Sequence, residues 1–164
     1  MDHPKPLGEL LYCTLQNLYY YSIAQQESYL NNGMRPRIHE NCTIELNGAR
    51  GAGFSWALRQ FLLNDCEKAI VVAPNLNMAD RIWRDDPVGR YKYKERGHIF
   101  SGVGTPDRVR GHATNVLIFS DYALMKATKG KELKRIEDGL LPVLHFSPGS
   151  ISCPDRHKAL IRLH

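Results

Sequence analysis

Residues 47–56 read NGARGAGFSW and have the composition of a phosphate-binding loop. A loop of the form G-x-x-x-x-G-K-[ST] binds phosphates through backbone amides, a lysine and a hydroxyl that holds Mg²⁺. Ser55 supplies the hydroxyl, but Phe54 stands at the position of the lysine. The amides that approach the ligand would come from a set of glycines, namely Gly48, Gly51 and Gly53. The stretch therefore predicts an anion site that lacks its usual cation.

A second stretch that could do chemistry closes the apolar run NVLIFSD, residues 115–121. ATPases commonly end such a strand with two adjacent carboxylates, one supporting the Mg²⁺ shell and one orienting the attacking water. Here these positions are Ser120 and Asp121, and a serine cannot supply the missing charge. A shift of register by one residue makes Asp121 the metal-associated acid and puts Tyr122 in place of the base, with the same loss.

Other site chemistries have little support in the sequence. The four cysteines lie far apart without a C-x-x-C pair, which indicates reduced, buried thiols. Neither an H-E-x-x-H pair nor a G-x-S-x-G elbow occurs. No run approaches the roughly 18 apolar residues that cross a bilayer, and the N-terminus lacks the plan of a signal peptide. These patterns predict a soluble, intracellular protein without a membrane partner.

The charge balance favours anionic partners. The net charge is +5 and the isoelectric point is near 9.1, a surplus that is also common in proteins that bind no nucleic acid. The densest basic stretch is RYKYKERGH, residues 90–98, where Lys92 and Lys94 interleave with tyrosines that could stack on bases. A solvated loop is the favoured interpretation of this stretch. Arg108 and Arg110 permit, but do not require, contacts with DNA phosphates.

The elements that must position these residues alternate along the chain. Helical apolar spacing over residues 7–30 predicts an N-terminal helical segment, residues 1–34, followed by an α/β domain, residues 35–164. Strands are expected at 42–46, 68–74, 98–103, 115–121 and 141–148. Helices are expected at 55–65, 75–86, 105–111, 122–139 and 153–163, with Asn75 or Asn77 capping the second and Thr105 the third.

Strands that alternate with helices, each strand almost continuously apolar, predict a three-layer α/β domain with a mainly parallel sheet. Ligands of such sheets bind at the carboxyl ends of the strands. We therefore expect four segments to meet at one edge because each directly follows a strand: residues 48–55, Pro74, the pair at 120–121 and the pair at 147–148.

Four segments in this order resemble the ATPase domain of the large terminase subunits of tailed phages, the motors that drive viral DNA into capsids. The resemblance covers roughly residues 35 to 150, is closest to the T-even-like branch, and rests on residues 47–56, 68–85, 98–125 and 141–149. Its most specific part is GTPDRVRGH, residues 104–112, which in terminases lies just ahead of the acidic strand.

The resemblance implies a role for individual residues. Arg50 matches an internal arginine finger that acts on the terminal phosphate, a task suited to the fixed donors of a guanidinium. Ser147, in the segment FSPG, matches the polar residue that senses the terminal phosphate, although a simple proline–glycine turn explains this segment equally well. The resemblance also implies that Ser55 and Asp121 are the metal ligands, whereas Phe54 and Ser120 depart from the family pattern.

These departures bear on the expected function. Groups aimed at developing charge are each worth roughly 10²–10³ in rate, so the loss of a lysine and a carboxylate removes most turnover. Backbone amides at a helix N-terminus still favour anions, which implies weak binding of ATP and Mg²⁺. Together with these departures, the resemblance implies a phage-encoded pseudoenzyme in the host cytoplasm. It would act by binding DNA, the packaging complex or a host protein, as an accessory or regulatory factor.

Two other interpretations remain open at this point. An active packaging ATPase could use Arg50 or Arg59 in place of the lysine. The glycine run could instead be a tight turn in an α/β interaction module without a ligand. The nuclease domain of full terminases would need about another domain's length of chain, so DNA cleavage is not expected.

Overall fold

The computed structural model describes residues 6–48, 53–86, 90–109, 114–144 and 157–164. Five strands form one sheet in the order β1-β5-β4-β2-β3, and every neighbouring pair is parallel. The strands are β1 (Thr43–Leu46), β2 (Ile70–Ala73), β3 (Ile99–Gly102), β4 (Val116–Phe119) and β5 (Ala159–Leu163). The parallel α/β architecture expected from the sequence is confirmed.

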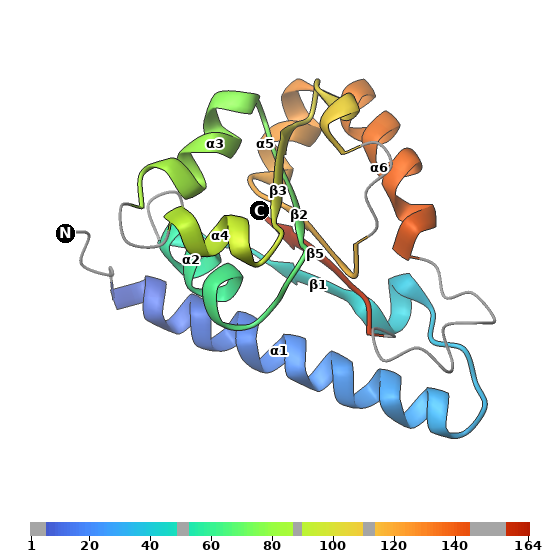
Figure 1. The fold of residues 1–164 in the computed structure, drawn as a ribbon. Helices are drawn as coiled ribbons and strands as arrows, with labels where there is room; N and C mark the ends of the chain where they lie inside the picture. The colour runs from blue at the N-terminus through green and yellow to red at the C-terminus, as the bar shows by residue number, and fades with distance from the viewer. Residues whose placement is uncertain (1–5, 49–52, 87–89, 110–113, 145–156) are drawn as a thin grey trace.

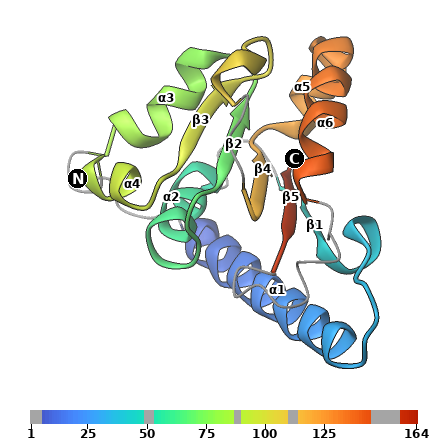
Figure 2. The same ribbon diagram turned by 45° about the vertical axis from the view of Figure 1, so that its right-hand side comes forward.

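Helices cover both faces of this sheet (Figures 1 and 2). The α1 face is covered by α1 (Pro6–Asn31), α2 (Phe54–Asn64), α3 (Leu76–Arg84) and α4 (Arg90–Glu95). The α6 face is covered by α5 (Tyr122–Thr128) and α6 (Gly130–Leu144), together with the short turns η1 (Ile38–Cys42) and η2 (Pro106–Arg108). The three layers are therefore helices, sheet and helices. No helix in the described part of the chain is long and apolar enough to span a membrane.

The sheet is held by two hydrophobic clusters because successive strand side chains point to opposite faces. Val71 and Ile118 join the helices of the α1 face, whereas Ile70 and Leu117 join those of the α6 face. All four residues of β2 and of β4 are buried, as expected for inner strands of a parallel sheet. This burial explains why both strands read as continuous apolar runs.

The last strand differs from the sequence prediction. Residues 141–144 continue α6 instead of starting a strand, and the expected terminal helix over 153–163 contains β5. Leu133, Ile136 and Leu140 recur at helical spacing on the core side of α6 and carry the helix forward. A run as short as Ala159–Leu163 cannot be assigned by periodicity alone, since helices and buried strands of this length look alike.

The basic stretch also differs from the prediction. Residues 90–95 form α4 instead of a loop, and Tyr93 from this helix is 1% exposed in the core. The Tyr93 hydroxyl donates a hydrogen bond to Asp86 (3.0 Å). One inward-facing aromatic residue among charged neighbours was too weak a pattern to indicate a helix.

The expected helix starts are only partly confirmed. Asn75 caps α3, accepting a hydrogen bond from the Met78 amide (2.8 Å). After β3, Thr105 precedes a single 3₁₀ turn, and its hydroxyl bonds the amide of Gly102 (3.1 Å). Thr105 therefore closes the turn that follows β3.

The N-terminal helix α1 packs directly on the beginning of α2. A Cβ built on Gly8 would lie 3.5 Å from the carbonyl oxygen of Gly53, and the Tyr12 ring meets Trp56 edge-on. Farther along the helix, Leu15 and Tyr19 enter the hydrophobic cluster of the α1 face. The helix is thus part of the same core as the sheet.

Candidate functional site

The segments that follow β1, β2 and β4 lie together at the carboxyl ends of the strands, which we call the carboxyl edge of the sheet. Because the strands are parallel, Gly48, Pro74 and Asp121 all lie beyond the same edge. Strand β5 separates β1 from β4, which puts the glycine loop and Asp121 two strand spacings, or about 10 Å, apart in the sheet. This distance leaves room for a ligand between them.

The glycine loop joins β1 to α2. Gly48 is half-buried after β1, and Gly53 has φ 100° and ψ 22° at the start of α2. This left-handed conformation is easy only for glycine, so the requirement for glycine at position 53 is a backbone requirement. Arg50 and Gly51, which carry much of the expected ligand contact, lie outside the described residues.

The first turn of α2 supplies a hydroxyl but no cation. Phe54 is half-buried and packs against the hydrophobic cluster of the α1 face, which is how the helix uses the position of the missing lysine. Ser55 is exposed beside it. The chemistry left at this turn consists of the Ser55 hydroxyl and the amides of the helix N-terminus.

Asp121 occupies an unusual backbone position after β4. It is exposed, with φ 57° and ψ 47°, and no side-chain bond caps α5 from it. A left-handed aspartate is uncommon, and backbone hydrogen bonds on both sides of Asp121 hold it here. The Ser120 amide donates to the carbonyl of Val72 (2.8 Å), and the Met125 amide donates to the backbone carbonyl of Asp121 (3.1 Å). The carboxylate is therefore presented to solvent at the carboxyl edge.

The two oxygen groups expected to hold a metal, Ser55 and Asp121, lie at the start of α2 and just before α5. No group of three or more His, Cys, Asp or Glu side chains that could hold a metal occurs in the described ranges. Mg²⁺ commonly binds through one or two protein oxygens together with substrate phosphates. Ser55 would contact Mg²⁺ directly and Asp121 would bind it through the water shell of the ion, and the bound ion would supply charge neutralisation at the phosphates.

A polar network that sequence reasoning missed fills the α6 face of this edge. Arg162 of β5 pairs with Glu45 (3.2 Å) and Glu137 (3.6 Å), and its guanidinium lies 4.9 Å from the centre of the Tyr122 ring. Burial and a hydrogen bond to Glu137 raise the pKa of Tyr122. The arginine is engaged by two carboxylates, so it does not replace the missing lysine.

The strand beside β1 is β5, and the residue that follows it is His164. The His164 amide bonds the carbonyl of Leu46 (2.8 Å), and its ring packs edge-on against Tyr122. Ser147 was expected at the end of a strand over 141–148, of which residues 141–144 belong to α6, and Ser147 itself lies outside the described residues. The apolar run at 159–163 was the available signal for the true strand.

The structure places Arg59 away from the candidate site. Its Nε donates to the carbonyl of Ile82 (2.8 Å) and an Nη to that of Arg81 (3.3 Å), so it caps the last turn of α3. Of the two arginines considered as substitutes for the lysine, Arg59 has this other structural use. Arg50 remains the alternative.

The basic residues considered for nucleic-acid contact separate into two groups. Lys94 and Arg108 line one cavity of about 530 Å³ beside β3, whereas Lys92 is exposed on α4 and is not among its lining residues. Arg108 is tied down by Asp80 (3.2 Å) and the carbonyl of Phe100 (3.1 Å). Arg110 lies outside the described residues.

Comparison with known proteins gives no independent support for a family. No protein-family model matches the chain, and no curated protein matches it either.

Proposed function

We propose that this chain is a terminase-like P-loop protein with a degenerate nucleotide site, which acts by binding and not by turnover. Three features support the proposal: the strand–glycine loop–helix unit formed by β1 and α2, the left-handed Gly53, and a single carboxylate, Asp121, beyond β4 at the same edge. In active P-loop enzymes the corresponding places hold a lysine and a pair of acids.

The observation that carries the proposal is the way Phe54 is used. Its ring packs against the core, and the described part of the first α2 turn offers the ligand only a hydroxyl and amides. Amides at a helix N-terminus bind phosphate without a lysine, but they supply less of the charge that develops during phosphoryl transfer. We therefore expect weak binding of ATP with Mg²⁺ and very slow hydrolysis.

A protein of this kind would serve as an accessory or regulatory factor. The resemblance to terminases favours a phage-encoded role in the host cytoplasm, with DNA, the packaging complex or a host protein as partner. The excess of positive charge favours an anionic partner among these.

Calorimetry with ATP and Mg²⁺, beside phosphate release with and without DNA, tests the proposal. We expect weak binding and no release above background. Robust turnover would refute the pseudoenzyme and support an active ATPase that uses Arg50. That enzyme would then lose its activity on Arg50→Ala.

Restoring the cation gives a sharper test. Phe54→Lys should strengthen ATP binding by roughly tenfold, because a charged hydrogen bond to phosphate adds about 1.5 kcal/mol or more. Gln60→Lys is the matched control, since it adds the same charge farther along α2. An equal increase of ATP affinity in the two variants would indicate general charge attraction and not a phosphate-binding loop. Thermal unfolding of Phe54→Lys measures how much core packing is lost.

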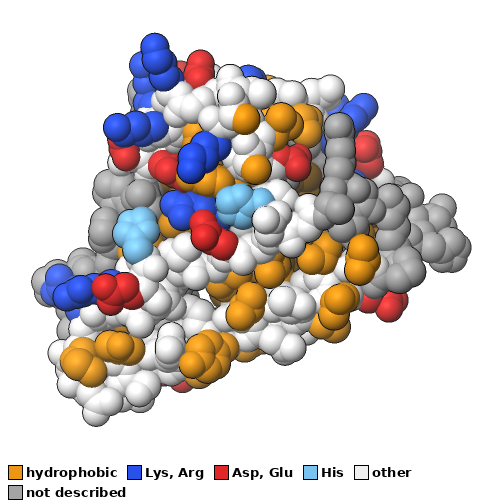
Figure 3. Space-filling model, turned by 180° about the vertical axis from the view of Figure 1, so that it is seen from behind, with side chains coloured by type: hydrophobic (Ala, Val, Ile, Leu, Met, Phe, Trp, Pro, Cys, Tyr) orange, Lys and Arg blue, Asp and Glu red, His pale blue; other side chains and the backbone are white. Residues whose placement is uncertain are grey.

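The ligand-free interaction module has one observation in its favour. Residues 10–26 of α1 carry no charged side chain, and several of the exposed ones are apolar, including Leu10, Leu18 and Tyr21. Figure 3 shows hydrophobic side chains along the lower part of the molecule, where α1 lies. ATP binding that is absent, or that Phe54→Lys leaves unchanged, would select this function.

A further inference from the structure

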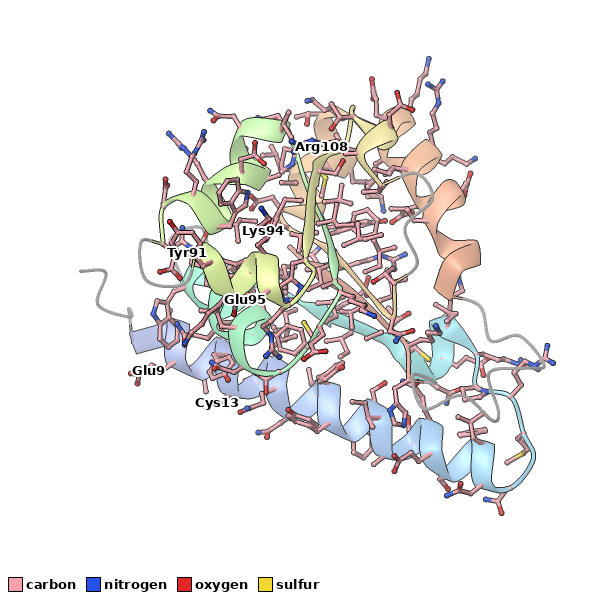
Figure 4. All side chains as sticks on the ribbon, in the orientation of Figure 1. Glu9, Cys13, Tyr91, Lys94, Glu95 and Arg108 are labelled. Carbon is pink, nitrogen blue, oxygen red and sulfur yellow. The ribbon has the colours of Figure 1, made fainter. Side chains whose placement is uncertain are left out.

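The cavity lies beside the edge strand β3, on the far side of the sheet from the edge strand β1 and its glycine loop. It has a volume of about 530 Å³, opens to solvent, and is lined by residues of α3, α4 and β3 and by Arg108, which ends η2. Figure 4 shows Tyr91 and Lys94 on α4 and Arg108 past the end of β3. Because β1 and β3 are the two edge strands, four strand spacings separate the cavity from the glycine loop, or about 19 Å in the sheet.

Aromatic side chains form much of the cavity wall. Trp83 and Phe100 line it from α3 and β3, and Tyr91 is 75% exposed at α4. Tyr93, two residues farther along the same short helix, is 1% exposed. Tyr93 thus anchors α4 in the core while Tyr91 remains available to stack on a planar ligand.

The charged groups of the cavity have a positive balance. Lys94 is exposed, and Arg108 is half-exposed while paired with Asp80, so two cations stand against one carboxylate. His98 adds no charge, because burial lowers its pKa and its ring accepts from the Ala69 amide (3.1 Å) and contacts the Leu62 carbonyl (2.6 Å). This balance favours an anionic ligand.

Three outward backbone groups of β3 are already bonded. Arg108 donates to the carbonyl of Phe100 (3.1 Å), and the Thr105 hydroxyl bonds both the amide and the carbonyl of Gly102 (3.1 Å each). An edge strand capped in this way is a poor template for an added peptide strand. Recognition at this edge must therefore come from the side chains of the cavity.

We propose that this cavity is a nucleotide-binding site, in which a base stacks on Tyr91 near Trp83 and a phosphate contacts Lys94. A cavity of 300–1,000 Å³ with apolar walls and few polar groups is typical of small-ligand sites. The nucleotide can come free or as part of single-stranded nucleic acid, because the same stacking and charge recognise both. The site is separate from the glycine loop and does not depend on the function proposed above.

Tryptophan fluorescence of Trp83 reports binding directly. The chain has two tryptophans, so a Trp56→Phe background leaves Trp83 as the single reporter. Adenosine monophosphate and a thymidine decanucleotide are the probes, titrated at low and at physiological salt. Tighter binding of the decanucleotide identifies single-stranded nucleic acid as the ligand, and equal or tighter binding of the monophosphate identifies free nucleotide.

Two pairs of variants test the assignment of residues. We expect Tyr91→Ala to weaken binding about tenfold, as loss of one stacked base does, and Lys94→Gln to weaken it severalfold. The controls are Tyr21→Ala, an exposed tyrosine on α1, and Lys92→Gln, an exposed lysine on α4, both of which should stay within about twofold.

Three results would overturn the proposal. One is that neither probe binds. Another is an equal effect of Lys92→Gln and Lys94→Gln, which would indicate general charge attraction. The third is unchanged affinity of Tyr91→Ala while its circular dichroism matches the parent. Phe54→Lys should leave this fluorescence response unchanged, which separates the outcome here from that at the glycine loop.

Discussion

Gly102 sets the distance between β3 and the N-terminus of α3. A Cβ on this residue would lie 2.6 Å from the amide nitrogen of Leu76 and 2.8 Å from the carbonyl carbon of Asn75. Both neighbours are backbone atoms at the capped start of α3 and cannot rotate away. This close approach positions α3, from which one wall of the β3 cavity is built.

Gly102→Ala should therefore be destabilising by about 1–3 kcal/mol, the usual range for forcing an extra methyl group into a packed site. Gly104→Ala is the matched control, because nothing lies within 4 Å of its Cβ position. Urea unfolding of both variants gives the comparison. Similar midpoints for the two would show that α3 moves aside without resistance.

At the scale of elements, Gln26 connects the N-terminal helix to the last strand of the sheet. Its buried amide donates to the carbonyl of Lys158 (2.7 Å) and accepts from the amide of the same residue (2.8 Å). Ser22, one turn earlier, donates to the carbonyl of Asn41 before β1 (2.6 Å). Two polar residues on the buried side of α1 thus fix the starts of β1 and β5.

Replacing Gln26 with alanine should be destabilising by about 1–2 kcal/mol, because the amide and carbonyl of the half-buried Lys158 lose their partners. Gln25→Ala, one residue away on a more exposed side of α1, should change stability by less than about 0.5 kcal/mol. Hydrogen exchange of the β5 amides provides a second measurement. Protection that survives in Gln26→Ala would contradict the role given to this bridge.

Asp65, at the end of α2, accepts hydrogen bonds from three side chains of α1: Tyr12 (2.8 Å), Gln16 (2.9 Å) and Tyr20 (2.9 Å). Burial, followed by the bond to Asp65, raises the pKa of Tyr12 to about 12. The contact between α1 and α2 therefore uses the protonated phenol.

This contact predicts a loss of stability in alkali. The pKa of Tyr12 in the folded chain exceeds the value of about 10 for an unfolded tyrosine, so its contribution is present below pH 10 and is lost as the pH rises toward 12. Tyr12→Phe should unfold in urea with a shallower pH dependence over this range than the natural chain. Tyr21→Phe is the control at an exposed position. Parallel pH profiles of all three proteins would rule out this linkage.

At the scale of the whole molecule, the two hydrophobic clusters share one sheet, and each contains a buried cysteine. Cys66 belongs to the α1 face and Cys42 to the α6 face, and burial raises the pKa of both thiols, that of Cys42 to about 12. Cys13 is exposed on α1. The thiols of the two faces therefore report on the unfolding of each layer.

In a Cys13→Ser, Cys153→Ser background, we expect Cys42 and Cys66 to resist a thiol reagent at pH 8 and to become reactive together at the urea midpoint. Reactivity requires exposure because the thiolate is the nucleophile and burial suppresses it. Mass spectrometry resolves the two labelled peptides. Labelling of one cysteine well before the other would mean that the two layers unfold separately.

Much of the architecture follows from local pattern. β2 and β4 are recognisable because they are buried on both faces, and Asp121 stands out because it comes just after one of these runs. The glycine loop stands out by its composition, although β1 before it is only partly buried. β5 was missed because its place depends on partners far along the chain, as in the bridge from Gln26 to Lys158. The network of Arg162, Glu45 and Glu137 joins three elements, so no spacing within the sequence could indicate it.

The order of the strands has a consequence for how the sheet is assembled during synthesis. In the described sheet β1 pairs with β5 alone, yet β1 is the first strand to be made and β5 the last. A nascent chain that has produced β1 to β4 therefore exposes an unpaired side of both β1 and β4, with a strand-wide gap between them. Until β5 is inserted, these edges are open to intermolecular pairing, and the emerging polypeptide is a natural client for chaperones.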